Sequence, residues 1–395
     1  MLEPLDEGEP EVVLVAHDVG PIGGMERQLS ILIGGLLERG WKVTVLSRTL
    51  AIPPHPALTW IRVPGPRRPF SLAYPWFALA GGALLLKHRR GRVVHSTGAL
   101  LPNRTDLVTV HLCHRELARR GLRRASRSGL TYRVNAVTAS LLSSLGERWC
   151  YSPARARCLV AVSNGLCREL ARHTAQEPAS IRIIPNGVDA DVFRPDPVRR
   201  AEVRRALGLA PGDLVALFVG SEWERKGLRA SLEGVADAPP WHLVVVGAGD
   251  QERYRGLSRR LGAEERTRFV APTADTAAYY AGADAFVLPS AYETFSLVTY
   301  EAAASGLPLL ATRVSGVEDL LVDGVNGWFL EPRASDISAR LRELEAAPRL
   351  RRSMGRRSRA AAEGFGWSRA VAAYAELYRA LAPRPERLGA EAASC

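Results

Sequence analysis

Two carboxylates, Glu293 and Glu301, lie eight positions apart in the segment PSAYETFSLVTYEAAASGLP, residues 289–308. The apolar run AFVLPS predicts a buried parallel strand, which places Glu293 in the following turn and Glu301 in the next helix. Ligands of open parallel sheets gather at the carboxyl ends of strands, where helix starts offer unpaired N–H groups to anions. Carboxylates at this edge suit sugar hydroxyls and the amides suit phosphates. Two solvated surface acids are the plainer alternative.

Two further loops carry residue types that suit phosphate binding. The loop FVGSEWERKGL follows a predicted strand with Gly220 and presents Arg225 and Lys226 together. Adjacent cations after a glycine turn can neutralise a diphosphate, including the charge that grows as it departs. The loop VVVGAGD places Gly247 and Gly249 where backbone must come close to a ligand or a neighbouring loop. Each loop alone is weak, because a lone basic pair is usually solvated and Gly-x-Gly is usually a turn.

The alternation of strands and helices predicts a parallel sheet in each half of the chain, with right-handed crossovers. In the first half we expect a strand at 11–16, a helix over 29–40, a strand at 41–46 and a Pro-rich loop over 52–69. The second half restarts at IRIIPNGVD, residues 181–189, and continues with strands in LVALFVG, HLVVVGAG, RTRFVAP, AFVLPS and LPLLAT.

At 395 residues the chain exceeds one ordinary core and should form two domains. A helical segment after GFG, Trp367 to Leu381, is expected to pack back across the domain junction. The predicted parts are a loose tail at 1–10, a first Rossmann-like domain at 11–180, a second Rossmann-like domain at 181–366, the C-terminal helix at 367–382 and a loose tail at 383–395.

The composition is that of a folded α/β protein, with 47% hydrophobic and 24% charged residues. The net charge of +12 favours an anionic binding partner, such as a nucleotide or a membrane surface. Nucleic acid is not expected, because no RNP motif, zinc-finger spacing or basic helix-turn-helix unit is present. Five cysteines without CxxC pairs and an acidic start without a secretory signal indicate a cytoplasmic protein with reduced thiols.

Two segments of the first half raise the question of membrane contact. The apolar run at 72–86 is shorter than the roughly 20 residues needed to span a bilayer, and Pro75 would interrupt its start. A buried crossover helix is the favoured interpretation and a membrane-surface helix the alternative. Arginines recur every four positions from Arg115 to Arg127, which predicts a basic helical face. That face is either solvated or docks to an anionic acceptor or to lipid headgroups.

Taken in order, the motifs resemble the retaining glycosyltransferases of family four, which have the GT-B fold and a Glu-x7-Glu motif. The resemblance runs from GGMER through VTVH, AVSNG, IPNGVDADVFRP, VGSEWERKG and VVVGAGD to YETFSLVTYEAAASGLP and VDGVNGWFLEP. The loop GSEWERKG is most similar to that of members that glucosylate lipopolysaccharide cores. The resemblance implies two Rossmann-like domains whose parallel sheets face each other across a cleft. It also implies that the domain at 11–180 binds the acceptor and that the domain at 181–366 binds the nucleotide sugar.

The resemblance also implies roles for individual residues. Glu293 would contact donor-sugar hydroxyls and Glu301 the nucleotide ribose, while Arg225 and Lys226 would clamp the diphosphate. His111 would lie near the reacting sugar, although a buried structural histidine is the alternative. The implied catalytic residues are Lys226, Arg225, Glu293 and His111. The implied donor site comprises Gly23, Gly24, Gly220, Arg225, Lys226, Gly247, Val270, Glu293, Phe295, Ser296, Leu297 and Glu301.

Some positions depart from the family pattern. Ser221 stands where an arginine is common, so Arg225 must supply that charge. Thr294 and Ser296 replace glycines beside Glu293, which puts the pose of the donor sugar in doubt; Ser296 is a candidate to cap the following helix. No metal is implied, and a zinc site at His111, Cys113 and His114 lacks a fourth ligand.

The sequence therefore predicts a retaining glycosyltransferase that moves a hexose from a nucleotide diphosphate sugar, UDP- or GDP-linked. The acceptor is expected to be a glycan, a lipid-linked molecule or a small molecule, and no cofactor is expected. An epimerase or phosphorylase of the same fold, and a catalytically silent homologue that binds a membrane or a protein partner, are the alternatives. The expected location is the cytoplasm, with a peripheral position on the inner face of the cell membrane as a further hypothesis.

Overall fold

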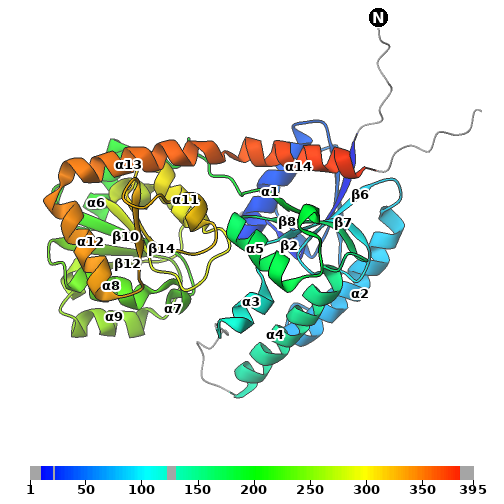
Figure 1. The fold of residues 1–395 in the computed structure, drawn as a ribbon, viewed down its shortest axis with the longest axis horizontal. Helices are drawn as coiled ribbons and strands as arrows, with labels where there is room; N and C mark the ends of the chain where they lie inside the picture. Colours follow the sequence, from blue (N-terminus) through cyan, green and yellow to red (C-terminus); the bar gives the residue numbers. More distant parts are fainter. Residues whose placement is uncertain (1–9, 21–22, 122–129, 383–395) are drawn as a thin grey trace, which may run out of the picture.

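The computed structural model describes residues 10–20, 23–121 and 130–382, and the side chains of 130–136 are not described. Figure 1 shows two α/β halves side by side, with one long helical segment running along the top of both. All strand pairs of the two large sheets are parallel, which confirms the α/β organisation predicted from the sequence. The predicted loose tails and Cys395 lie outside the described residues, Pro10 excepted.

The first half is built on a sheet rich in Val and Leu, as expected for strands buried on both faces. Its strands are β1 (Glu11–Val15), β3 (Lys42–Ser47), β5 (Leu58–Arg62), β6 (Val93–Thr97), β7 (Thr105–Val110), β8 (Ala156–Ala161) and β9 (Ile181–Ile183). In space they follow the order β5-β3-β1-β6-β7-β8-β9. The chain therefore moves outward in both directions from β1 and β6, whose carboxyl ends form the switch point where ligands bind in open sheets. A small pair, β2 (Asp18–Val19) and β4 (Thr49–Leu50), lies beside this sheet.

Helices cover both faces of the first sheet and bury two separate apolar clusters against it. The helices are α1 (Gly24–Leu37), α2 (Phe70–His88), α3 (His114–Arg119), α4 (Leu130–Cys150) and α5 (Asn164–His173), followed by the 3-10 turn η1 (Pro178–Ser180). The cluster under α1 also includes residues of the C-terminal helix described below.

The second half repeats this plan with a shorter sheet. Its strands are β10 (Leu214–Val219), β11 (Trp241–Val246), β12 (Thr267–Val270), β13 (Ala285–Leu288), β14 (Leu309–Thr312) and β15 (Gly327–Leu330). Their spatial order is β12-β11-β10-β13-β14-β15, so the switch point lies between β10 and β13. The loops that leave these two strands are the two that carry Lys226 and Glu293.

The remaining helices pack around the second sheet and along the top of the molecule (Figure 1). They are α6 (Pro197–Ala206), α7 (Trp223–Lys226), α8 (Leu228–Ala236), α9 (Gln251–Arg260), α10 (Ala277–Gly282), α11 (Leu297–Ala304), α12 (Ala334–Ala346), α13 (Pro348–Ala362) and α14 (Trp367–Leu381), with 3-10 turns η2 (Glu264–Arg266), η3 (Val317–Asp319) and η4 (Glu363–Phe365).

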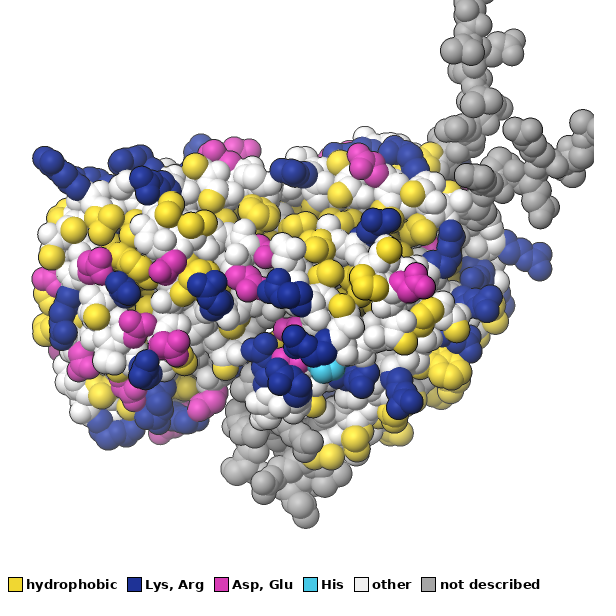
Figure 2. Space-filling model, viewed as in Figure 1, with side chains coloured by type: hydrophobic (Ala, Val, Ile, Leu, Met, Phe, Trp, Pro, Cys, Tyr) yellow, Lys and Arg dark blue, Asp and Glu magenta, His cyan; other side chains and the backbone are white. Residues whose placement is uncertain are grey.

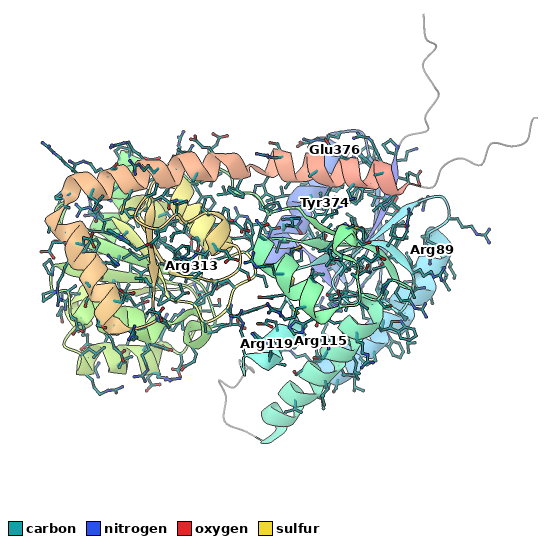
Figure 3. All side chains as sticks on the ribbon, viewed as in Figure 1. Arg89, Arg115, Arg119, Arg313, Tyr374 and Glu376 are labelled. Atoms are coloured by element: carbon teal, nitrogen blue, oxygen red, sulfur yellow. The ribbon has the colours of Figure 1, made fainter. Side chains whose placement is uncertain are left out.

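Helix α14 has the predicted bounds and packs against the first half, although it follows the second half in the chain. The buried His95 ring forms two hydrogen bonds. Its Nδ1 lies 2.7 Å from the Tyr378 hydroxyl, and its Nε2 lies 2.8 Å from the Thr109 hydroxyl. Tyr374 completes the contact with a 2.9 Å bond to Thr109. Figure 3 shows Tyr374 on the side of α14 that faces the first half and Glu376 on the opposite side. This helix therefore ties the end of the chain to the first sheet.

Three predictions about the elements of the first half were wrong. Helix α1 begins at Gly24, five residues before the predicted start, because Gly23 takes a positive φ of 95° and the helix starts directly after it. Strand β5 lies inside the predicted loop 52–69; it is an edge strand, and exposed Trp60 hides the alternating pattern. Strand β9 pairs with β8, so residues 181–183 complete the first sheet instead of opening the second.

Helix α2 also differs from the prediction of a buried helix at 72–86. It runs over 19 residues with Pro75 inside its second turn, and it is the one described helix that is long and apolar enough to cross a membrane. Only 28% of its apolar window is buried. Its outward face exposes large hydrophobic side chains, among them Leu79.

The predicted basic face after Arg115 is described only in part. In α3 and just beyond it, Arg119 and Arg120 donate hydrogen bonds at 2.7 and 2.8 Å to the buried carboxylate of Glu116. Their charges are therefore engaged within the fold. Figure 3 shows Arg115 and Arg119 on α3, at the lower side of the first half. The other arginines of the predicted face, Arg123, Arg124 and Arg127, lie outside the described residues.

Candidate active site

The turn that carries Glu293 bridges the two halves. The hydroxyl of Thr294 donates a hydrogen bond to the carbonyl of His111, at the end of the β7 segment, at 2.6 Å. The hydroxyl of Ser163 in turn donates to the carbonyl of Thr294 at 2.6 Å. Thr294, which stands where the family pattern has a glycine, therefore makes a specific contact across the junction.

Glu293 is buried, and three donors surround one oxygen of its carboxylate. Lys226 Nζ donates to Oε1 at 2.7 Å, Ser290 Oγ at 3.0 Å and Arg225 Nη1 at 3.2 Å. Burial raises the pKa of Glu293, but the charges of Lys226 and Arg225 outweigh it and the net shift is downward. Glu293 is therefore ionised, which makes it a hydrogen-bond acceptor and a charge partner for the two cations.

Glycines shape the loop that holds these cations. Gly220, at the end of β10, has a φ of 144°, and a Cβ there would lie 2.6 Å from Cδ of Lys226. A Cβ on Gly247, with a φ of 138°, would lie 2.2 Å from the carbonyl oxygen of Gly220. Gly227 closes α7 at a φ of 79°, with no room for a Cβ beside the Pro289 carbonyl. Lys226 reaches Glu293 because these three positions carry no side chain.

Glu301 meets a residue that the sequence analysis did not assign, Arg27. Arg27 Nη1 donates to Oε1 of Glu301 at 3.0 Å, and the Tyr280 hydroxyl donates to Oε2 at 2.9 Å. Burial raises the pKa of the Glu301 carboxyl more than the charge of Arg27 lowers it. The guanidinium of Arg27 also lies 5.6 Å from the centroid of the Phe193 ring. The motif GGMER could have indicated Arg27 as a site residue, because it places Arg27 one turn beyond Gly24 in α1.

The first glycine loop lies against the start of α11. Gly23 has a φ of 95°, and a Cβ on Gly24 would lie 3.4 Å from Cδ1 of Leu297. The predicted donor residues of the two halves are thus brought together at this point. Val270 lies at the end of β12, where its carbonyl accepts from the Gly247 N–H at 3.0 Å.

The other two predicted donor residues of this turn are held by internal contacts. Phe295 is buried and stacks on Tyr300, with ring centroids 4.1 Å apart. Ser296 adopts the left-handed conformation, with a φ of 67°. Its hydroxyl forms a hydrogen bond with the Thr299 hydroxyl at 2.8 Å. Its side chain accepts no hydrogen bond from the backbone N–H groups at the start of α11. The prediction that the Ser296 side chain caps α11 was therefore wrong, because a residue in this conformation turns its hydroxyl away from the first amides. Strained backbone at a non-glycine residue is frequent at functional sites.

His111 contributes its backbone to the junction, and its ring is enclosed. Within the described part of the chain, Nε2 of His111 is buried without a hydrogen-bond partner. Burial lowers the pKa of the imidazole to about 4. The ring is therefore neutral near pH 7, and protonating it there would cost considerable free energy.

The two halves leave little free space at this site. The cavity between Arg27, Phe193 and Glu301 has a volume of about 10 Å³, which is room for about one water. A larger hollow of about 580 Å³ lies on α9, away from these residues, and carries none of the predicted chemistry. The space beside Glu301 is therefore too small for a sugar ring in this structure.

Comparisons with known proteins cover both halves. The family model described as Glycosyltransferase Family 4 matches residues 22–192, and the one described as Glycosyl transferases group 1 matches residues 199–361. A D-inositol 3-phosphate glycosyltransferase of Segniliparus rotundus is 30% identical over 396 residues, covering 91% of this chain and 85% of that protein. With the first curated relatives of the same name, the match spans only about half of their length.

Solved structures show the same fold. The crystal structure of WaaG, a glycosyltransferase involved in lipopolysaccharide biosynthesis, superposes with a TM-score of 0.78 at 21% identity, over 93% of this chain and 99% of that one. The structure of Anabaena Alr3699/HepE in complex with UDP and glucose gives a TM-score of 0.71 at 18% identity, over 94% and 100%. The family and the fold predicted from the sequence are confirmed. This chain belongs to glycosyltransferase family 4 and has the two-domain GT-B fold.

Proposed function

We propose that this protein transfers a hexose from a nucleotide diphosphate sugar to an acceptor hydroxyl, with retention of the anomeric configuration. The observation that carries the proposal is the cluster of Lys226, Arg225 and Glu293 at the switch point of the second sheet, in which Lys226 and Glu293 are buried. This is the edge where an open parallel sheet binds its ligands. A cation pair beside an ionised carboxylate suits a diphosphate next to a polyhydroxylated sugar.

In the proposed reaction the bond between the anomeric carbon and the diphosphate oxygen breaks, and a bond to the acceptor oxygen forms on the same face. The acceptor's proton passes to the departing phosphate oxygen, so no additional reactant is needed. Lys226 and Arg225 stabilise the negative charge that develops on the diphosphate. Glu293 accepts hydrogen bonds from the sugar hydroxyls, and its ion pairs hold it in place.

Glu301 is proposed to bind the ribose of the donor, and the amides of Gly23 and Gly24 to face its phosphates across the cleft. Arg27 lies one turn from these glycines and donates a hydrogen bond to Glu301. Arg27 is therefore proposed to hold the Glu301 carboxylate in place beside the ribose. His111 stays a proposed active-site residue whose neutral ring and carbonyl line the junction.

The donor is proposed to carry UDP, which the complexes of Alr3699/HepE with UDP-glucose support. The acceptor is proposed to be a sugar or an inositol phosphate, because the curated relatives carry the name D-inositol 3-phosphate glycosyltransferase. The first half is proposed to bind it. The described cysteines are free, which supports the proposed location in the cytoplasm.

The test is a donor screen followed by product analysis. Purified protein is incubated with radiolabelled UDP-glucose, UDP-N-acetylglucosamine, UDP-galactose or GDP-mannose, with and without D-inositol 3-phosphate or a glycan acceptor. Release of nucleotide diphosphate with one donor, and an acceptor-dependent product of retained configuration, is expected. An epimerised donor, a sugar phosphate formed with inorganic phosphate, or no turnover of any donor would overturn the proposal.

A further inference from the structure

The outward face of α2 is a continuous stripe of large hydrophobic side chains. Its members recur at intervals of three, four or seven positions, which puts them on one side of the helix. Leu79, at the middle, has 71% of its surface exposed. The members of the stripe are Leu72, Trp76, Leu79 and Leu86.

The opposite face of α2 is apolar as well, and it is part of the domain core. Phe77 and Leu85 are buried in a cluster with Val13 and Val94 of the first sheet. A core helix of a soluble domain needs only one apolar face. On the second apolar face of α2, Trp76 donates a hydrogen bond to the Pro64 carbonyl at 3.0 Å. The leucines of this face stay more than half exposed in the described chain.

Helix α4 carries a second exposed stripe, and its polarity is inverted. Exposed hydrophobic residues recur every four positions, while the polar Ser143 and Glu147 are buried beneath the helix. The carboxylate of Glu147 accepts hydrogen bonds from the backbone N–H groups of His114 and Arg115 at 2.7 and 3.3 Å. The inward polar side is therefore explained by a contact with the start of α3. On the outward side Trp149 donates a hydrogen bond to the Pro102 carbonyl at 3.2 Å, whereas Leu141 and Leu145 keep 60% and 63% of their surface exposed. The exposed residues are Val137, Leu141, Leu145 and Trp149.

The two stripes form one surface, because α2 and α4 pack side by side. The ring of Tyr74 in α2 lies against Gly146 in α4, where a Cβ would come within 2.1 Å of the tyrosine oxygen. Figure 1 shows the two helices along the lower right edge of the first half, and Figure 2 shows hydrophobic side chains gathered on that edge. We call these eight exposed residues of α2 and α4 the α2–α4 surface.

Cations surround the α2–α4 surface and exposed acids are absent from both helices. The sequence has no Asp or Glu between Ala51 and Thr105, and the one acid of α4, Glu147, is buried. Figure 3 shows Arg89 projecting away from the molecule at the end of α2. Basic residues occur before α2, at its end and at the end of α4: Arg67, Arg68, Lys87, Arg89, Arg90 and Arg148.

We propose that the α2–α4 surface docks on the surface of a bilayer that contains anionic phospholipids. Apolar stripes flanked by cations are the chemistry of helices that lie in the membrane interface, with side chains among the acyl chains and cations at the headgroups. A second copy of the chain would bring the same cations together and repel, whereas anionic headgroups complement them. Spanning is disfavoured, because it would pull Phe77 and Leu85 out of the core. The proposal is independent of which donor and acceptor the enzyme uses.

The experiment is vesicle flotation of the full chain at low and high salt. Vesicles of phosphatidylcholine alone are compared with an equimolar mixture of phosphatidylcholine and phosphatidylglycerol. We expect flotation with the anionic vesicles, weakened by high salt because screening shortens the reach of the charges. The variant Leu79→Glu with Leu141→Glu should weaken binding by at least about tenfold, since each leucine loses its apolar burial. Lys87→Gln with Arg90→Gln should weaken it about fivefold for each residue.

A matched control is Val198→Glu, since Val198 has a comparable exposure of 67% and lies on α6 in the other half. It should float like the parent protein. Nucleotide release in lipid-free buffer separates this proposal from the proposed function: the leucine variant should keep the parent rate. No flotation of the parent at low salt, or equal flotation of the leucine variant, would overturn the proposal. A lipid-free dimer in ultracentrifugation that the leucine variant abolishes would also overturn it, in favour of a second copy as the occupant.

Discussion

Arg27 and Glu301 form an ion pair across the junction of the two halves, with Nη1 and Oε1 3.0 Å apart, although the residues are 274 positions apart in the chain. Glu301 is buried, whereas the Arg27 side chain keeps 35% of its surface exposed. The pair joins α1 of the first half to α11 of the second. It therefore couples the proposed donor site to the relative position of the two halves.

The first prediction concerns the strength of this pair. A double-mutant cycle with Arg27→Met and Glu301→Gln should give a coupling of about 1 kcal/mol in the free energy of unfolding, because solvent screens the exposed side of the pair. Urea denaturation of the four proteins measures it. The pair Arg340 and Glu343, 3.0 Å apart on α12, is the control, because its carboxylate is 45% exposed, and it should give about zero. Equal couplings for the two pairs would show that burial of Glu301 adds nothing.

The second prediction concerns the proposed ribose contact. Glu301→Ala should weaken the affinity for UDP about tenfold, the loss of one charge-assisted hydrogen bond. Isothermal calorimetry measures the affinity, and Glu202→Ala, an exposed acid on α6, is the control. Unchanged UDP affinity in Glu301→Ala would remove Glu301 from the donor site.

The third prediction tests the diphosphate clamp. Lys226→Ala should lower turnover at saturating donor by about two orders of magnitude, because the developing charge loses a preorganised cation. Arg229→Ala, whose partner Glu233 is on the same exposed face of α8, should keep the parent rate. Thermal unfolding of both variants checks that they fold. Near-normal turnover in Lys226→Ala would contradict the proposed role.

The fourth prediction concerns the glycine that closes the Lys226 turn. Gly227→Ala should destabilise the protein by about 1 to 3 kcal/mol, since a positive φ is combined with a Cβ only 2.3 Å from the Pro289 carbonyl. Gly208→Ala is the control, because its φ of 65° is similar but nothing lies within 4 Å of its Cβ. The difference between their unfolding free energies isolates the steric clash. If the two losses are equal, backbone strain alone explains them.

The fifth prediction is a pH dependence of stability. Burial lowers the pKa of His111 to about 4 from an ordinary value of 6.5. Between these values the unfolded chain binds a proton at this residue and the folded chain does not. The free energy of unfolding should therefore fall as the pH is lowered from about 6.5 to 4, by on the order of 3 kcal/mol from His111.

His17 and His95 have pKa values lowered in the same direction by burial, so they add to the loss at acid pH. His111→Asn should reduce the difference in unfolding free energy between pH 7 and pH 5, measured by urea denaturation. An unchanged difference would mean that the ring is hydrated in the folded protein. The pH profile of turnover should show no break near 6.5 from His111, because its ring is already neutral there.

Local patterns determined much of the fold. The buried strands read as continuous apolar runs, and α14 shows a helical period with a glycine before it, so its bounds match the prediction. Edges were less predictable: β5 is exposed at Trp60 and has no apolar alternation to mark it. The sequence also did not show which face of α2 is buried. Both faces of this helix are apolar, so the pattern of residues does not distinguish them.

The sequence by itself determined the family, the parallel sheets and the loops that carry Lys226, Glu293 and Glu301, because these features depend on short segments with a definite composition. Only the tertiary structure decided that Arg27 pairs with Glu301 and that Thr294 bonds to His111. Those contacts join residues more than a hundred positions apart, and a single sequence records no distance between them. The tertiary structure also decided that β9 completes the first sheet, because strand pairing depends on which sheet edge is accessible to the segment.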